Sequence, residues 1–236
     1  MGENLRLVKY AIIDYRIFDE IKNELSKYAE SIIPTIRQNT YESICGHSDI
    51  QLCKIDDNTI VCAPNCFEYY KSRLSGVNVI CGEKNPNGNY PNDVLSNVCT
   101  SDGFAMHNFK YTDKITLAVI EQKFSKHITV RQGYSCCSTC AVGNAVITED
   151  GGIYKALTSN GIDALKISSG SVVLKGMNYG FFGGAVGVCK NNIFTVGDLN
   201  THSDAGQINE FLKERNINVY KLADGKLRDV GSILFF

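Results

Sequence analysis

The sequence predicts an α/β fold built as a closed ring of five β-α-β units. The first observation is an internal repeat, because an apolar strand-like run, a helical stretch and a second apolar run recur about every 45 residues, a period typical of closed repeat architectures. The second is that the chain ends in a strand-like run at residues 231–236 with no helix after it, while the first unit has no strand before it. Pairing of the two ends would complete the fifth unit.

Each predicted unit starts and closes with an apolar run rich in β-branched residues. The starting runs are KYAIID (9–14), NTIVCA (58–63), GFAMHN (103–108), NAVITE (144–149) and NIFTVG (192–197). The closing runs are SIIPTI (31–36), VNVICG (77–82), HITVRQ (127–132), IDALKI (162–167) and INVYKL (217–222). We expect the starting strands to lie nearest the centre of the ring and to direct their residues into it.

Between these runs, apolar residues recur at helical spacing and predict an amphipathic helix in every unit. The stripes are Ile17, Ile21, Leu25 and Tyr28; Phe67, Tyr70 and Leu74; Ile115, Ala118 and Val119; Ile153 and Leu157; and Ile208, Phe211 and Leu212. Residues 82–93 and 170–187 interrupt the repeat, and the glycines of the second stretch indicate either crowded strands or a close approach to a ligand. Neither stretch divides the chain, so we expect one domain over residues 1–236.

Composition excludes several classes of function. A net charge of −1 and a pI of about 6.4 indicate no basic face for nucleic acid. No apolar run is long enough to span a membrane, and the N-terminus lacks the apolar core of a signal peptide. Ten cysteines in such a chain are expected to stay reduced, which favours the cytoplasm. In strands we expect cysteines as small buried residues, namely Cys53, Cys62, Cys81, Cys99 and Cys189.

A triplet in the second unit pairs a titratable base with a carboxylate. His47 and Asp49 belong to the sequence Cys-Gly-His-Ser-Asp, which we expect to open an outer strand. Residues two apart share one face of a strand, so the two side chains would point into the same space. The alternative is a surface histidine and a turn aspartate.

A cysteine cluster opens the corresponding strand of the fourth unit. Cys137 is a candidate nucleophile, whereas Cys136, Cys137 and Cys140 together could hold zinc or an iron–sulfur cluster, or could simply pack as thiols. The chain has no second C-x-x-C to complete a metal site. Strand alternation would place Cys136 and Cys137 on opposite faces, so only one could face the centre.

Asp229 completes a candidate site in the closed ring. It lies in the Asp-Val-Gly-Ser-Ile-Leu run that we expect to be the outer strand of the first unit, at the register of His47 and Cys137. A cysteine, a histidine and carboxylates that converge on a small cavity are the composition of covalent thiol catalysis.

These motifs resemble those of a known enzyme class. The segment GHSDIQLCKIDDNTIVCAP is similar to the G-H-x-D strand of agmatine deiminases and their relatives, the guanidino-group-modifying enzymes of the pentein fold, a five-bladed β/α propeller. Residues 133–139 resemble the G-x-x-x-C-x-T signature of that family, and residues 229–234 resemble its E-G-G strand, shifted to the C-terminus. The resemblance spans most of the chain as architecture but only about 25 positions as motif.

The resemblance implies roles for the candidate residues. Cys137 would attack the central carbon of a guanidinium or amidine, and His47 would protonate the leaving amine and then activate water. Asp49 would pair with the N–H groups of the substrate, and Asp229 would orient His47 or hold the other side of the substrate. The outcome would be hydrolysis or transfer of the amidino group, with no metal or organic cofactor. The family register favours Cys137 over Cys136 as nucleophile.

One departure from the family concerns substrate charge. The family supplies a further carboxylate from an Arg-Asp pair, but residues 178–184 carry glycines there, and Asp229 stands where the family has glutamate. We therefore expect Asn178 to supply a neutral hydrogen bond to a less charged substrate. The predicted partner is a small molecule, with neither nucleic acid nor membrane, and a homodimer is possible. The alternatives are a non-catalytic, ligand-binding or ribosome-associated pentein and a cysteine-cluster metal protein.

Overall fold

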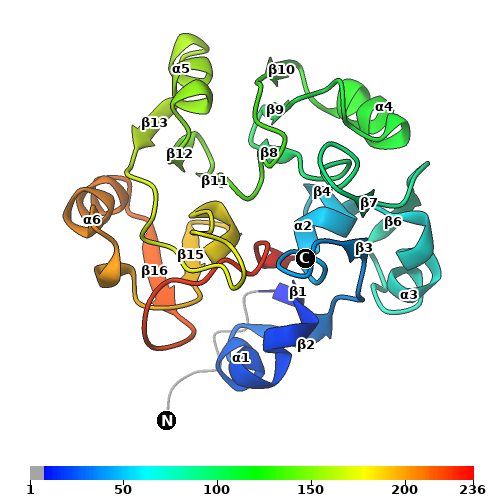
Figure 1. Ribbon diagram of the computed structural model, residues 1–236, viewed down its shortest axis with the longest axis horizontal. Coiled ribbons are helices and arrows are strands. Elements are labelled where there is room, and N and C mark those ends of the chain that lie inside the picture. The colour runs from blue at the N-terminus through cyan, green and yellow to red at the C-terminus, as the bar shows by residue number, and fades with distance from the viewer. Residues whose placement is uncertain (1–7) are drawn as a thin grey trace.

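The chain forms an α/β structure of five three-stranded sheets and one two-stranded sheet, described here from a computed structural model for residues 8–236 (Figure 1). The expectation that the N-terminus lacks a signal peptide, and residues 1–7 of the expected domain, fall outside these residues. Within residues 8–236, no helix combines the length and apolar character needed to cross a membrane.

All five three-stranded sheets share one topology, in which the middle strand is antiparallel to one neighbour and parallel to the other. The sheets are β17–β1–β2 (Leu234–Phe235, Val8–Ile13, Ala29–Pro34), β4–β5–β6 (Leu52–Asp56, Thr59–Cys62, Asn78–Cys81), β8–β9–β10 (Cys99–Ser101, Phe104–His107, Lys126–Thr129), β11–β12–β13 (Thr139–Val142, Ala145–Thr148, Asp163–Lys166) and β14–β15–β16 (Val186–Cys189, Asn192–Thr195, Asn218–Lys221). The C-terminal β17 pairs with β1, which confirms the expected pairing of the two ends. The two-stranded sheet joins β3 (Asn39–Thr40) to β7 (Asn87–Gly88).

One helix connects the two parallel strands of each three-stranded sheet, and these helices lie at the periphery in Figure 1. They are α1 (Phe18–Leu25), α3 (Phe67–Lys71), α4 (Lys114–Lys123), α5 (Gly151–Ser159) and α6 (Ala205–Glu214). Aspartates fix the starts of two of them, because Asp113 Oδ1 accepts hydrogen bonds from N–H groups of α4 and Asp150 Oδ1 from those of α5. Four of the five expected apolar stripes face inward, although α3 ends before Leu74. The stripe expected for α4 is wrong, because Ile115 and Ala118 are exposed and Thr116 and Ile120 are the buried residues.

The prediction of which strand of each unit lies nearest the centre is wrong by one strand. Contacts between neighbouring sheets join β4 to β8, β8 to β11, β11 to β14 and β14 to β17, which are the antiparallel edge strands. These five strands also line a cavity of about 610 Å³. The runs predicted as innermost are instead the middle strands of their sheets, because each lies between two hydrogen-bonded neighbours. Residues just before the antiparallel edge strands are therefore the ones that meet near the middle of the molecule.

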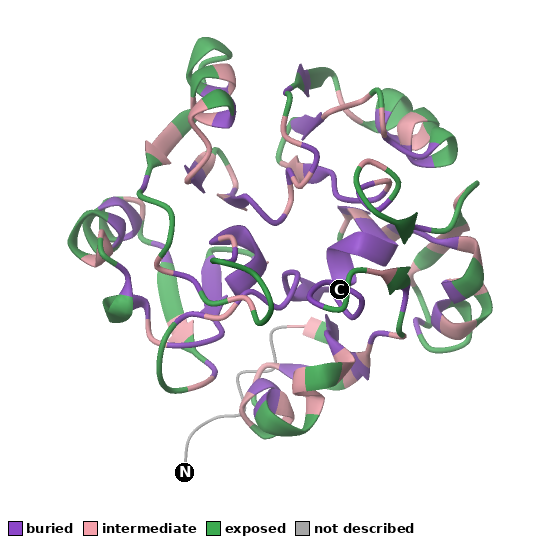
Figure 2. Cartoon of the chain, in the orientation of Figure 1, coloured by how far each residue is buried: buried purple, intermediate pink, exposed green. Residues whose placement is uncertain are grey.

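Burial follows this arrangement, with buried segments inside and exposed helical faces outside (Figure 2). Four of the five cysteines predicted as buried strand residues are buried, whereas Cys81 is exposed at the end of the edge strand β6. All ten cysteines are free thiols.

Candidate active site

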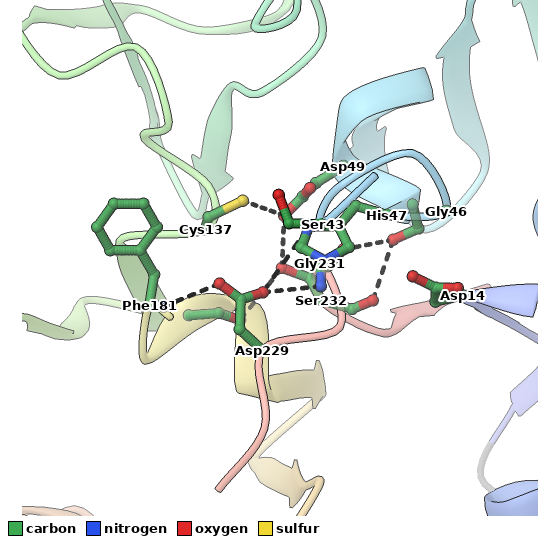
Figure 3. A network of polar contacts seen from close by, with 12 residues as sticks. Asp14, Ser43, Gly46, His47, Asp49, Cys137, Phe181, Asp229, Gly231 and Ser232 are labelled. Atoms are coloured by element: carbon green, nitrogen blue, oxygen red, sulfur yellow. Dashed lines mark hydrogen bonds and ion pairs between the residues drawn. The ribbon is translucent and has the colours of Figure 1, made fainter. Parts of the chain in front are cut away.

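Four of the predicted site residues converge on one buried cluster (Figure 3). His47 and Asp49 precede β4, Cys137 precedes β11 and Asp229 precedes β17. A ring nitrogen of His47, a carboxylate oxygen of Asp49 and the sulfur of Cys137 all lie within 4.8 Å of one another. The fold therefore brings together groups that are far apart in the sequence.

The His47 segment is a turn followed by a short helix, not the expected strand. His47 directly precedes α2 (Ser48–Gln51), so the shared-face argument was wrong, although the two side chains do meet. Thr35 Oγ1 donates a hydrogen bond of 2.6 Å to Gly46 O and holds the turn. The Asp14–Arg16 ion pair supports it as well, because the Arg16 guanidinium donates to Ser43 O at 3.0 Å.

The cysteine segment is also a turn, so strand alternation does not separate Cys136 from Cys137. Asn97 organises this turn: its Oδ1 accepts hydrogen bonds from the backbone N–H of Cys136 (2.8 Å) and Cys137 (3.2 Å). Asn97 Nδ2 lies 3.1 Å from Cys137 Sγ and donates to it. A ring nitrogen of His107 lies 2.8 Å from Gly133 O at the start of the same segment.

Asp229 is held by backbone N–H groups and by close glycines. Its Oδ2 accepts from Phe181 N at 2.8 Å, and its Oδ1 accepts from Gly231 N at 3.0 Å. A Cβ at Gly184 would overlap the Asp229 carboxylate, and a Cβ at Gly231 would overlap His47. Of the two explanations for the glycines of residues 170–187, the structure supports crowding at Gly184, because protein atoms fill the space there.

Asp49 connects Cys137 and Ser232, because one of its carboxylate oxygens contacts both side chains. The Cys137 thiol donates to Asp49 Oδ2 at 2.9 Å, and the Ser232 hydroxyl lies 3.0 Å from the same oxygen. Ser232 has a φ of 66°, in the left-handed region that favours glycine. A side chain held in this unfavourable backbone conformation is typical of a functional segment.

Burial sets the electrostatics of the cluster. It raises the pKa of Asp229 to about 7 and that of Asp49 to about 6, although the hydrogen bonds to each carboxylate oppose the shift. Burial, together with the nearby Arg16 charge, lowers the pKa of His47 to about 3. Burial and the Asp49 and Asp229 carboxylates hold the pKa of the Cys137 thiol well above its ordinary value. In this state the thiol is protonated at neutral pH.

Several polar atoms of the cluster are buried without a partner. Among residues 8–236, neither ring nitrogen of His47 makes a hydrogen bond, and Asp49 Oδ1 has no donor. His47 Nδ1 lies 3.8 Å from Asp229 Oδ1, which is too long for a hydrogen bond. Buried polar groups are nearly always paired in native proteins, so such a group of unpaired atoms is typical of a binding site.

Asn178, predicted to contact substrate, is not part of this cluster. It lies exposed on the segment that leads to Gly180 and Phe181, whereas the four cluster residues are buried. Its role stays a prediction.

Sequence reasoning missed two polar residues, Asn97 and Glu149. Asn97 precedes β8 at the same spacing as Cys137 precedes β11, so alignment of these two units would have pointed to it. Glu149 follows β12, and burial raises the pKa of its carboxyl to about 8. In the sequence, Glu149 reads only as the last residue of the expected strand NAVITE (144–149).

His47, Asp49 and Cys137 offer nitrogen, oxygen and sulfur atoms at distances that would also suit a metal ion. Cys140 instead packs in the apolar core near Ile147 and Val186. In the part of the chain that the structure describes, Cys136, Cys137 and Cys140 do not form a ligand group, so the cysteine-cluster site predicted as an alternative is not supported.

Comparison with solved structures identifies the fold class. A DDAH from Pseudomonas aeruginosa, solved in complex with citrulline, superposes with a TM-score of 0.58 at 8% identity, over 98% of this chain and 100% of the other. Agmatine deiminase from C. jejuni gives a TM-score of 0.54 at 7% identity, with coverage of 94% and 89%. An amidinotransferase from Microseira wollei gives 0.53 at 7%, with coverage of 94% and 90%. The predicted resemblance to the pentein fold of guanidino-group-modifying enzymes is confirmed at the level of the fold.

Within this fold class, the chain belongs to the family described as "Family of unknown function (DUF6873)", which matches residues 12–234. A search of curated proteins finds no significant match.

Proposed function

We propose that this protein is a cysteine-dependent hydrolase or amidinotransferase that acts on a small guanidine- or amidine-like compound. The observation that carries the proposal is the convergence of Cys137, His47, Asp49 and Asp229 in one buried cluster in which both His47 ring nitrogens and Asp49 Oδ1 are unpaired among the described residues. A planar N–H donor group matches carboxylate acceptors of this kind.

The charges of the cluster favour a cationic substrate. Asp49 and Asp229 are both buried, and in the described chain neither forms an ion pair with a lysine or arginine. A bound cation would favour the ionised form of both carboxylates. It would also lower the pKa of the Cys137 thiol, since a nearby positive charge stabilises a thiolate. In this scheme the nucleophile becomes activated when the substrate binds.

The proposed reaction uses these residues as follows. The Cys137 thiol passes its proton to His47, and the thiolate attacks the central carbon of the substrate, forming a C–S bond. His47 returns the proton to the departing amine as the C–N bond breaks, which leaves a covalent thiouronium-type intermediate. Attack by water or by an amine then breaks the C–S bond and regenerates the thiol.

In this proposal, substrate reaches the buried cluster when the exposed residues 176–179 move, while Phe181 and the buried Phe182 stay in place. Residues 176–179 lead through Gly180 to Phe181, whose N–H donates to Asp229. Displacement of residues 176–179 would open the cluster, and their return would bring Asn178 toward the substrate. Asn178 therefore remains a candidate substrate contact.

We also propose that the five sheets are the blades of a five-bladed β/α propeller. Three features support this: the common topology, the contacts that join successive antiparallel edge strands, and the cavity that all five of these strands line. Lys54, on β4, donates to Phe235 O of β17 at 2.6 Å and so links the remaining pair of sheets. The free thiols favour a reducing compartment such as the cytoplasm.

The test is site-resolved alkylation of the purified protein, read by mass spectrometry. 2-Chloroacetamidine is a cationic reagent and 2-chloroacetamide is its neutral counterpart; with either, the sulfur displaces chloride. We expect Cys137 to react faster with the amidine than with the amide, and the His47→Ala variant to lose most of this rate. The other nine thiols are internal controls.

A second candidate, a non-catalytic binding protein of the same fold, is favoured by one observation: the cluster side chains are almost fully buried. Equal labelling of Cys137 by both reagents, at the rate of a buried thiol, would support that alternative and contradict catalysis.

A further inference from the structure

We infer that Glu149 is the second carboxylate that contacts the cationic end of the substrate, together with Asp229. In this role it replaces the acid that the glycine-rich residues 178–184 lack. The inference rests on the proposed function and defines its substrate class as cationic amidines and guanidines, not the less charged compounds expected from the sequence.

The strand register places Glu149 beside the nucleophile. Thr148 pairs with Thr139 across the antiparallel strands β12 and β11. The Thr148 hydroxyl donates to Ser138 O at 2.8 Å. Glu149 therefore leaves β12 next to the turn that carries Cys137.

One short segment links Glu149 to Asp229. The backbone N–H of Phe181 donates to Asp229 Oδ2 at 2.8 Å, and that of the next residue, Phe182, donates to Glu149 Oε1 at 3.2 Å. Consecutive backbone N–H groups thus hold the two carboxylates near each other. The Asp229 carboxylate accordingly contributes, after burial, to the raised pKa of Glu149.

The second oxygen of Glu149 is free to bind a ligand. Oε2 is buried and has no hydrogen-bond partner within residues 8–236, while Oε1 is already anchored. No lysine or arginine among these residues forms an ion pair with Glu149, and Arg16 is engaged with Asp14. A buried carboxylate without a counter-charge is unfavourable, and the N–H groups of a bound amidinium would supply both the charge and the hydrogen bonds.

The glycine segment itself cannot provide this acid. A side chain at Gly180 or Gly184 would overlap Asp229, and one at Gly183 would overlap the backbone of the Cys137 turn. These glycine positions therefore cannot carry the second carboxylate, and the half-buried Glu149 contacts the same segment through the Phe182 N–H.

The test uses the same pair of reagents on Glu149→Gln. Glutamine keeps an oxygen that accepts the Phe182 N–H but removes the charge. We expect the ratio of amidine to amide alkylation at Cys137 to fall about tenfold or more, as for loss of a charged hydrogen bond. The matched control is Glu68→Gln, an exposed change on α3, which is expected to leave the ratio unchanged.

Two outcomes separate this inference from the proposed function. If the native protein prefers the amidine and Glu149→Gln keeps that preference, Glu149 only anchors the segment and the inference is wrong. If the native protein shows no preference, the proposed function fails with it. Should Glu149→Gln not fold, Glu149→Asp retains the charge but shortens the side chain by one methylene group; a lowered ratio then supports the inference and an unchanged ratio overturns it.

Discussion

The sulfur of Cys137 lies 2.9 Å from Oδ2 of Asp49, and both groups are almost completely buried. This contact links the candidate nucleophile to a carboxylate that raises the pKa of the thiol. In the proposed mechanism, the thiol stays protonated until a cationic compound binds, so the charge of that compound would control the reactivity of Cys137.

Asp49→Asn is predicted to raise the rate of alkylation by the neutral reagent and to lower the ratio of the amidine rate to the amide rate. Loss of the negative charge lowers the pKa of the Cys137 thiol, so alkylation by the neutral 2-chloroacetamide should rise by roughly tenfold for each pKa unit. Alkylation by 2-chloroacetamidine should fall relative to the amide, because a carboxylate partner of the cation is gone. Rates measured by mass spectrometry at pH 7 test this prediction. Asp19→Asn, which changes an exposed aspartate of α1, serves as the control.

A parallel fall of both rates in Asp49→Asn would contradict the assigned role. It would indicate that Asp49 holds the shape of the cluster through its contacts with Cys137 and Ser232 and does not control the charge there.

Stability should decrease as the pH rises from 6.5 to 8. Glu149 and Asp229 have folded-state pKa values raised to about 8 and about 7, so in this range the folded chain binds more protons than the unfolded chain. Each such group lowers the free energy of unfolding by up to about 1.4 kcal/mol per pH unit until the pH passes its folded-state pKa. The lowered pKa of His47 makes the free energy of unfolding rise with pH instead. This effect acts below about pH 6.5, where the histidine of the unfolded chain gains a proton.

Urea unfolding at several pH values tests this linkage. Glu149→Gln should reduce the dependence on pH between 6.5 and 8, whereas Glu68→Gln should leave it intact. An unchanged dependence in Glu149→Gln would show that the carboxyl of Glu149 titrates near its ordinary pKa.

Gly184→Ala should destabilise the protein by about 1–3 kcal/mol, because the added methyl group overlaps the Asp229 carboxylate in a filled space. The same substitution at Gly206, in α6, meets no atom within 4 Å and should be neutral or stabilising by about 0.5–1 kcal/mol. Urea unfolding of both variants provides the comparison. Equal stability of the two would mean that Asp229 moves aside at little cost.

Local patterns were sufficient for much of the architecture. The apolar runs and helical stripes identified the repeat units, and the helix-free run at residues 231–236 indicated that it pairs with the first strand. Such patterns are readable because hydrophobic periodicity reflects which face of each element is buried. The same reasoning placed the wrong strands at the centre, because the repeat alone does not show which edge of a sheet faces the middle.

The candidate site, too, was predictable from the sequence only in part. The sequence by itself determined which residue types are present: a thiol at Cys137, an imidazole at His47 and the carboxylates Asp49 and Asp229. Only the tertiary structure decided their contacts, because none of these residues lies in a strand and the strand periodicity assumed for them does not apply. The tertiary structure also placed Asn97 in the site and Glu149 near it, because the residues that they contact come from distant segments of the chain. The protonation states were likewise decided there, since the pKa of each group depends on burial that only the folded chain creates.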